Sequence, residues 1–126
     1  MQEHGSYSLD IKGQTHILKA YGAWNYETVQ RWGAETKQLV STIKSNPWAC
    51  LVDLTDWELA TPDAREYVYN INLWFNDNNL KYLAVVYSLH LQKEILTITH
   101  AALTNVEIKY VKTLKEAEIW LNSLGF

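Results

Sequence analysis

Residues 48–63 read WACLVDLTDWELATPD, and this stretch decides the fold. Its first part, Trp48 to Leu54, is a nearly continuous apolar run that is too short for a helix and typical of a central strand covered on both faces. The later residues Thr61-Pro62-Asp63 predict a helix start, because they combine a hydroxyl cap, a proline at the first helical position and a carboxylate near the positive end of the helix dipole. We therefore expect a buried strand, a loop over residues 55–60 and a helix that runs to about Asn78.

The N-terminal residues predict an antiparallel hairpin followed by a helix. Residues 7–12 alternate between apolar and polar side chains, which is typical of a half-buried strand. A two-residue turn at 13–14 contains glycine, and pairing across it places His16 opposite Ile11. The residues that follow predict a helix over 25–45, which Asn25 caps and Asn46-Pro47 ends.

The C-terminal half continues to alternate strands with helices. Residues 80–87 predict a second strand that is apolar on both faces, and residues 106–110 predict a one-sided strand at a sheet edge. A final helix opens with the capping box at 113–116. The apolar faces of the third and fourth helices are expected to be Leu91, Ile95, Ile98 and Ala102, and Leu114, Ala117, Leu121 and Leu124.

The element order is β-β-α-β-α-β-α-β-α, which predicts one α/β domain over residues 1–126. Each strand after the hairpin returns through a helix, so the sheet is mixed and five-stranded, with an N-terminal antiparallel hairpin and then parallel strands, and four main helices. Strands laid down in sequence order place most helices on one face of the sheet. The apolar centre of the other face then needs a cover, which could be a returning helix, a second subunit or an apolar ligand.

Composition and charge restrict the class of protein. The 126 residues include six Trp and eight Tyr, more rings than one small core normally holds, so some of them should lie near the surface. The net charge of −3 has both signs interspersed and offers no basic stripe, which argues against nucleic-acid binding. Apolar runs are too short to cross a bilayer and no signal peptide is recognisable, so we expect a cytosolic protein without an integral membrane segment.

The segment LVDLTDWELATPD at 51–63 and the tail VEIKYVKTLKEAEIWLNSLGF at 106–126 resemble the STAS superfamily, the fold of anti-sigma-factor antagonists. In particular they are similar to its bacterial SpoIIAA-like branch, and the resemblance covers essentially the whole chain. It implies a non-enzymatic module. Members of the superfamily bind partner proteins or nucleotides, and relatives in the SpoIIAA-like branch have been proposed to carry apolar molecules.

The chain departs from the superfamily at the start of the second helix. Many members carry Asp-Ser-Ser-Gly there, and phosphorylation of one Ser releases the partner. Aligning the preceding Asp-Leu-Thr with residues 53–55 places Asp63 where the phosphoserine would be. One hypothesis is that Asp63 permanently mimics the phosphorylated state, because a helix N-terminus favours a carboxylate as it favours phosphate. The alternative is that Asp63 only interacts with the helix dipole, and Thr61 is either a cap or another phosphorylation site.

Four carboxylates, Asp53, Asp56, Glu58 and Asp63, follow the buried strand at the edge where α/β sheets bind ligands. A phosphoaspartate receiver would use Asp53 as acceptor, with Ser88 and Lys112 after the next strands. Receivers also need an acidic metal-binding pair after an early strand, and the loop at 21–25 has no carboxylate. Loop anchoring and solvated charges are therefore the stronger interpretation, and the receiver remains a remote alternative.

No motif specifies a metal, a cofactor or a reaction. The four His residues do not cluster along the sequence, and the single Cys50 lies in an apolar run as a small core residue. We therefore expect a protein that is not an enzyme and needs no cofactor.

The second helix is apolar on two sides, which indicates that it lies between two bodies. One of these bodies is the sheet of the same domain. Tyr69 and Leu73 form a pair on a side of the helix away from the stripe that faces this sheet. In one mechanism a partner protein or a second copy of the chain docks there, with Trp57, Tyr69 and Leu73 as anchors. In the other, helices two and three cover a cavity for a lipid-like molecule, lined by Trp74, Phe75 and Ile95. The expected patch comprises Trp57, Leu59, Tyr69, Leu73, Trp74 and Phe75, and these residues could equally be core.

Overall fold

The computed structural model describes residues 4–126, apart from the side chains of His90, Leu91, Glu94 and Ile95. The α/β order is confirmed. The elements are β1 (Ser6–Lys12), β2 (Thr15–Trp24), α1 (Tyr26–Val40), β3 (Trp48–Ala60), α2 (Pro62–Asp77), β4 (Leu80–Val86), α3 (His90–His100), β5 (Glu107–Val111) and α4 (Leu114–Ser123).

The strands form one sheet in sequence order, β1-β2-β3-β4-β5. The β1–β2 hairpin is antiparallel and the other three pairs are parallel, as predicted. The predicted hairpin register is also confirmed, because Ile11 pairs with His16. Gly13, in the turn, has a φ of 59°, a conformation that glycine adopts without steric strain.

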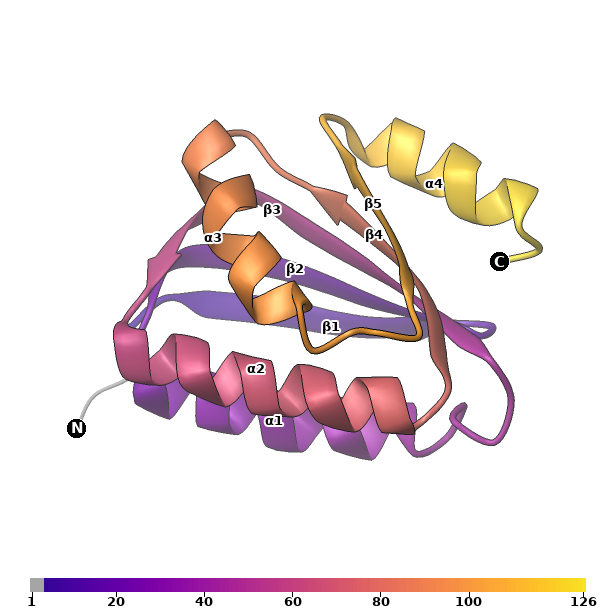
Figure 1. Ribbon diagram of the computed structural model, residues 1–126, viewed down its shortest axis with the longest axis horizontal. Coiled ribbons are helices and arrows are strands. Elements are labelled where there is room, and N and C mark those ends of the chain that lie inside the picture. Colours follow the sequence, from indigo (N-terminus) through magenta and orange to yellow (C-terminus); the bar gives the residue numbers. More distant parts are fainter. Residues whose placement is uncertain (1–3) are drawn as a thin grey trace.

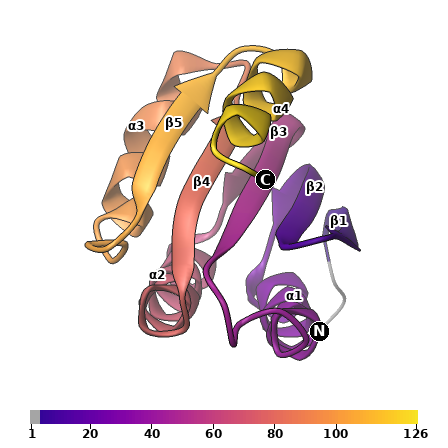
Figure 2. The same cartoon turned by 90° about the vertical axis from the view of Figure 1, so that its right-hand side faces the viewer.

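Helices cover both faces of the sheet. α1, α2 and α3 lie on one face and α4 lies on the other, as Figures 1 and 2 show. Among the three covers that the sequence left open for the second face, the structure has the returning helix. The core on this α4 face consists of seven buried residues: Ala49, Leu51, Ala84, Val86, Val111, Ala117 and Leu121.

β3 is longer than predicted, and the expected loop over residues 55–60 is wrong. These residues continue the strand, with Asp56 paired to Tyr21 and Ala60 paired to Trp24. Between Lys19 and Tyr21 the register shifts, so that β3 carries one residue more than β2. Such a bulge breaks the alternation of side chains that identifies a strand in a sequence. The residues that were expected to form an acidic loop therefore lie on a strand of the sheet.

α1 is shorter than predicted, because it ends at Val40 and not at Ser45. The Thr42 N–H donates to the Leu39 carbonyl at 3.1 Å, and the Ile43 N–H donates to the Val40 carbonyl at 3.0 Å. These bonds span three residues where an α-helix spans four, so the apolar periodicity continues in a tighter turn.

The predicted apolar face of α3 is partly wrong. Ile98 is 70% exposed, whereas Gln92, Leu96 and Thr99 are buried. The physical reason is that the Gln92 side chain is hydrogen-bonded to β3, which turns Leu96 and Thr99 toward the sheet. In α4, Ala117 and Leu121 are buried as predicted, but Leu114, at the first turn, is exposed. Within residues 4–126, none of the helices has the length and apolar character needed to cross a membrane.

Candidate functional site

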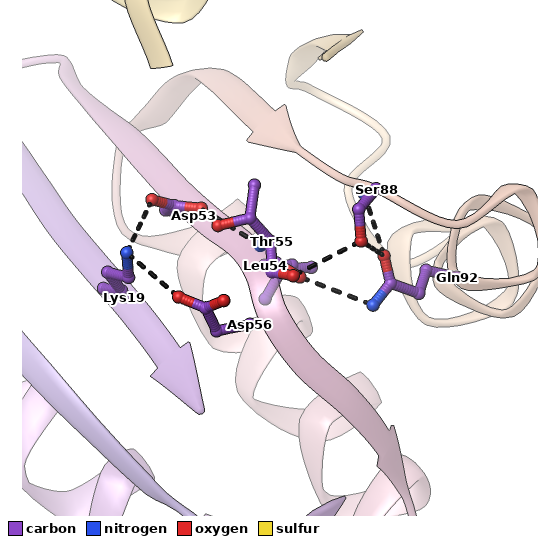
Figure 3. Close-up of polar contacts among 7 residues, drawn as sticks. All are labelled: Lys19, Asp53, Leu54, Thr55, Asp56, Ser88 and Gln92. Carbon is purple, nitrogen blue, oxygen red and sulfur yellow. Dashed lines mark hydrogen bonds and ion pairs between the residues drawn. The ribbon is translucent and has the colours of Figure 1, made fainter. Parts of the chain in front are cut away.

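The middle of β2 and β3, at the register shift between them, carries a small charged cluster, shown in Figure 3. Lys19 Nζ lies 3.5 Å from Asp53 Oδ2 and 3.3 Å from Asp56 Oδ2. The charge of Asp53, together with the hydrogen bond to Asp56, raises the pKa of Lys19 above its usual value. The Asp53 carboxylate also accepts hydrogen bonds from the Thr55 N–H at 3.0 Å and the Thr55 hydroxyl at 2.7 Å. Asp53 therefore anchors the bulged part of β3 and pairs with β2.

The remote receiver alternative gains nothing from this geometry. Lys112 Nζ lies over the Tyr87 ring, 4.1 Å from its centroid. Ser88 donates to the Thr55 carbonyl at 3.3 Å. Glu58 is exposed on the outer half of β3. The cation at Asp53 is Lys19, from the neighbouring strand, and not the residue that a receiver would use.

Gln92 connects α3 to β3 and was missed in the sequence. Its Oε1 accepts from the Ser88 N–H and the Leu89 N–H, both at 3.1 Å, and its Nε2 donates to the carbonyls of Leu54 and Trp57. Figure 3 shows the contacts with Ser88 and Leu54. A buried amide that satisfies backbone groups on two elements is a rigid connection. Its signal in the sequence is a polar residue that shares a helical face with Leu96.

The start of α2 differs in detail from the prediction. The Thr61 side chain makes no capping hydrogen bond. It donates instead to Asp63 Oδ1 at 2.5 Å, and the same oxygen accepts from the Ala64 N–H at 2.9 Å. The Thr61 hydroxyl lowers the pKa of Asp63, so this carboxylate is charged at the positive end of α2. The predicted hydroxyl cap is wrong, because Asp63 accepts from the Ala64 N–H that a capping hydroxyl would accept from.

The predicted patch is divided between the interior and the surface. Trp57 is only 7% exposed and Phe75 is also buried, so neither ring is available as a surface anchor. Leu59, Tyr69 and Leu73 are exposed. Trp74 is half-buried, with Lys37 Nζ and Lys44 Nζ each 5.4 Å from its ring centroid.

An interior cavity of about 80 Å³ lies between the sheet and the layer formed by α1, α2 and α3. Its walls are predominantly apolar and come from three strands and three helices. Of the lining residues that the carrier mechanism predicts, Phe75 lines the cavity and Trp74 does not, while the side chain of Ile95 lies outside the described residues. The lining residues that carry its polar character are His16, Trp32, Trp57, Arg65, Asn72, Thr99 and His100.

Three N–H donors of these lining residues have no hydrogen-bond partner within the described part of the chain. They are the indole Nε1 atoms of Trp32 and Trp57 and the Nε atom of Arg65. Asn72, by contrast, donates to the Thr99 carbonyl at 3.0 Å. Buried donors without partners are rare in folded proteins, so these three atoms are an unusual feature of the residues that line the cavity.

The two histidines that line the cavity are uncharged at neutral pH. Burial lowers the pKa of His16 and that of His100 to about 4. The rings are held by neutral groups: His16 lies 3.4 Å from the Thr36 hydroxyl and 3.5 Å from Cys50 Sγ, and His100 Nδ1 lies 2.7 Å from the Tyr110 hydroxyl. Arg65 is therefore the cationic group in the cavity wall at neutral pH.

The described residues contain no group of three His, Cys, Asp or Glu side chains that could hold a metal ion. Burial raises the pKa of Cys50 to about 12, which keeps it a thiol at physiological pH. The cavity combines a mostly apolar lining with a few polar residues, and this composition is typical of a binding site.

Comparison with solved structures identifies the fold. An uncharacterized protein of the DUF3478 family with a SpoIIAA-like fold, from Shewanella loihica, has a TM-score of 0.74 at 17% identity over 96% of both chains. The anti-sigma factor antagonist SpoIIAA in its unphosphorylated form has a TM-score of 0.67 at 8% identity, over 96% of this chain and all of the other. An anti-sigma factor antagonist from Mycobacterium paratuberculosis has a TM-score of 0.63 at 10% identity, over 94% of this chain and 95% of the other.

Sequence comparison adds no closer relative, because neither a protein-family model nor a curated protein matches the chain. The structural likeness extends over nearly the whole length and includes the mixed five-stranded sheet with four helices. The resemblance drawn from residues 51–63 and 106–126 is thereby confirmed: the chain has the SpoIIAA-like α/β fold.

Proposed function

We propose that this chain is a non-catalytic binding module that holds a small, largely apolar molecule in its interior cavity. The observation that carries this proposal is the cavity between the sheet and α1 to α3, whose mostly apolar lining includes three residues that each carry a buried N–H donor without a partner. Pockets for small molecules have this composition, with mostly apolar walls and a few polar groups that orient the ligand. A bound molecule would fill the packing gap and satisfy one or more of the donors.

The volume restricts the size of what is buried there. A water molecule occupies roughly 30 Å³ in the liquid, and an apolar cavity of about 150 Å³ accepts a benzene ring. A cavity of about 80 Å³ therefore accommodates a group of a few carbon atoms. Any longer part of the ligand has to lie outside it.

The test uses 1-hexanol, an uncharged probe with a short alkyl chain. Trp24, Trp32 and Trp57 line the cavity, so binding should change the intrinsic fluorescence in a saturable way. The variant Val68→Phe adds volume to the cavity wall and is expected to abolish the change. Leu73→Phe adds volume to the exposed side of the same helix and serves as the matched control. The proposal is wrong if 1-hexanol gives no saturable signal, or if Val68→Phe binds it as well as Leu73→Phe does.

A second candidate function is docking of a protein through the outward side of α2. Its support is the exposure of Leu59, Tyr69 and Leu73, to which Ile98 of α3 adds apolar surface. Tyr69 and Ile98 border the same depression between the two helices. Two of the similar structures are anti-sigma factor antagonists, which are named for their action through another protein. In this function the charged Asp63 would act as the fixed counterpart of a phosphorylated residue.

Sedimentation velocity over a wide concentration range tests this candidate with the chain itself as partner. Docking of two copies predicts a dimer that weakens in the double variant Tyr69→Ser, Leu73→Ser. Substitution of Asp63 by Asn should also change the dimer population if its charge regulates docking. A monomer at every concentration, identical in all three proteins, would rule out self-association through this surface.

A further inference from the structure

Arg65 belongs to two hollows of the molecule. It lines the interior cavity, and together with Pro62, Glu66, Tyr69, Ile98 and Thr99 it lines a more open groove of about 320 Å³ between α2 and α3. Thr99 is also common to both. The two hollows therefore adjoin at Arg65 and Thr99, and these two residues lie between the groove and the cavity.

Arg65 has an unusual electrostatic environment. It is half-buried in the first turns of α2, its Nε atom is buried without a hydrogen-bond partner, and no described carboxylate forms an ion pair with it. Partial removal of an arginine from water costs free energy that proteins usually recover through a carboxylate or phosphate. The guanidinium group of Arg65 therefore has unused capacity to bind an anion.

The other polar atoms of the cavity point to the same ligand chemistry. Among the lining residues, the buried atoms without a partner are all N–H donors, on Trp32, Trp57 and Arg65. A ligand that satisfies them has to bring hydrogen-bond acceptors. His16 and His100 have a pKa of about 4, so neither adds a charge that would compete with Arg65 at neutral pH.

We propose that Arg65 binds the carboxylate of a small aliphatic acid whose apolar chain occupies the interior cavity and which enters through the groove between α2 and α3. This inference rests on the proposed function and adds the chemical class of the ligand. A guanidinium group matches a carboxylate with two parallel hydrogen bonds, which an alcohol or an alkane cannot accept in the same way. The exposed Glu66 at the groove repels anions at the outer surface, so the favourable place for the carboxylate is the inner end, at Arg65.

The dimensions favour a short acid. At roughly 30 Å³ for a group of the size of a water molecule, the cavity takes about three carbon atoms, and the remaining carbons and the carboxylate lie at the junction with the groove. Hexanoate has a chain of this length. We therefore choose hexanoate as the probe, 1-hexanol as the probe with the same chain and no charge, and acetate as the probe with the charge and almost no chain.

The experiment is isothermal titration of these three compounds into the intact chain at pH 7 and low ionic strength. Hexanoate should bind about tenfold more tightly than 1-hexanol, and acetate should give no saturable binding, because a charge-assisted hydrogen bond contributes enough for a change of this order. Arg65→Gln should weaken hexanoate about tenfold and leave 1-hexanol unchanged. Arg65→Lys keeps the charge but loses the forked geometry, so its affinity for hexanoate should lie between that of the wild type and that of Arg65→Gln. Lys81→Gln removes an exposed cation on β4 and is the matched control for net charge.

The outcomes separate this inference from the proposed function. Equal affinity for hexanoate and 1-hexanol, unchanged in Arg65→Gln, would overturn the role of Arg65 and leave the cavity as a site for uncharged molecules. Failure of both compounds to bind would overturn the proposed function as well. An equal loss of hexanoate binding in Arg65→Gln and Lys81→Gln would show a non-specific effect of charge and also overturn the inference. Urea unfolding of each variant establishes that it is folded. If Arg65→Gln does not fold, the comparison of Arg65→Lys with the wild type still tests the inference.

Discussion

The two faces of the sheet are packed by different means. On the α4 face, Ala49 and Ala84 of the sheet meet Ala117 of the helix, and all three are fully buried. On the opposite face, large rings such as Trp32 and Phe75 fill the space between the sheet and three helices, and a cavity of about 80 Å³ lies among them. Small side chains allow a helix to approach a sheet closely, whereas rigid rings leave gaps where their edges do not match.

Buried polar groups lie on both faces, since the unpartnered Thr15 hydroxyl and the Asp53 carboxylate are on the α4 side, but the N–H donors without partners lie on one face. The buried His16 and the unpartnered donors of Trp32, Trp57 and Arg65 all belong to the face covered by α1 to α3. The cluster under α4 consists of aliphatic side chains, with Tyr82, Trp120 and Phe126 packed at its margin. Unsatisfied polar groups lower stability, and proteins retain them mainly where a ligand or a conformational change uses them. The comparison indicates a structural role for the α4 face and a binding role for the other.

The largest expected difference between the faces is their response to acid. His16 has a folded pKa of about 4 against 6.5 when unfolded, so the unfolded chain binds the extra proton between these values. Stability is therefore fully present above pH 6.5 and declines as the pH falls toward 4, by about 3 kcal/mol from this residue. Urea unfolding of the intact chain at pH 7 and pH 4.5 measures the loss.

The variant His16→Leu should show a smaller loss between the two pH values. The conservative variant Leu121→Val, on the α4 face, lowers stability without touching a titrating group and should keep the pH dependence of the wild type. An equally steep pH dependence in His16→Leu would assign the acid sensitivity to other groups.

Added volume should affect the two faces differently. Ala84→Leu inserts methyl groups into the closely packed α4 face, and overpacking of this kind costs typically 1–3 kcal/mol. Val68→Leu extends a side chain that lines the cavity, so its cost should be below about 1 kcal/mol, or it should be stabilising. Urea unfolding at pH 7 gives both values. Equal destabilisation by the two changes would mean that the α1 to α3 face is packed as tightly as the other.

The smallest effect is expected outside both cores. Tyr69→Ser and Leu73→Ser change exposed residues on the outward side of α2, and surface changes of this kind usually alter stability by less than about 0.5 kcal/mol. Thermal unfolding checks this for each single variant. A loss of several degrees in either would show that the outward side of α2 contributes to the fold, and would leave these variants unsuitable as tests of docking.

Much of the fold follows from local patterns. The run at 48–54, the hairpin around 13–14 and the capping box at 113–116 each predict an element that the structure contains. Sequence patterns failed where a contact between distant elements decides the length of a strand or the orientation of a helix. The bulge after Asp53 depends on pairing with β2, and the orientation of α3 depends on the hydrogen bonds of Gln92 to β3. The bulge has no signature in the neighbouring residues, and the signal for Gln92 is only a polar residue on the same helical face as Leu96.

The candidate site was harder to predict than the fold. The carrier alternative named Phe75, which lines the cavity, but it did not name Arg65 and Asn72, because polar residues on a helix are usually assigned to solvent. Both lie on the inward side of α2, seven residues apart, next to the apolar stripe. A polar residue repeated at this interval beside an apolar stripe was the available signal. The orphaned donors of Trp32 and Trp57 depend on the whole tertiary structure and leave no trace in the sequence.

The most direct test of a binding role for the α1 to α3 face is an NMR titration of the intact chain with hexanoate, observed at the six indole N–H signals. Trp32 and Trp57 line the cavity and have indole donors without partners. Trp120, on α4, packs against the core on the other face of the sheet. The Trp48 indole donates to the Asn78 carbonyl at 2.6 Å. We predict saturable shifts for Trp32 and Trp57 and unchanged signals for Trp48 and Trp120. Shifts at Trp120 with Trp32 and Trp57 unmoved, or no shifts at saturating hexanoate, would contradict the account.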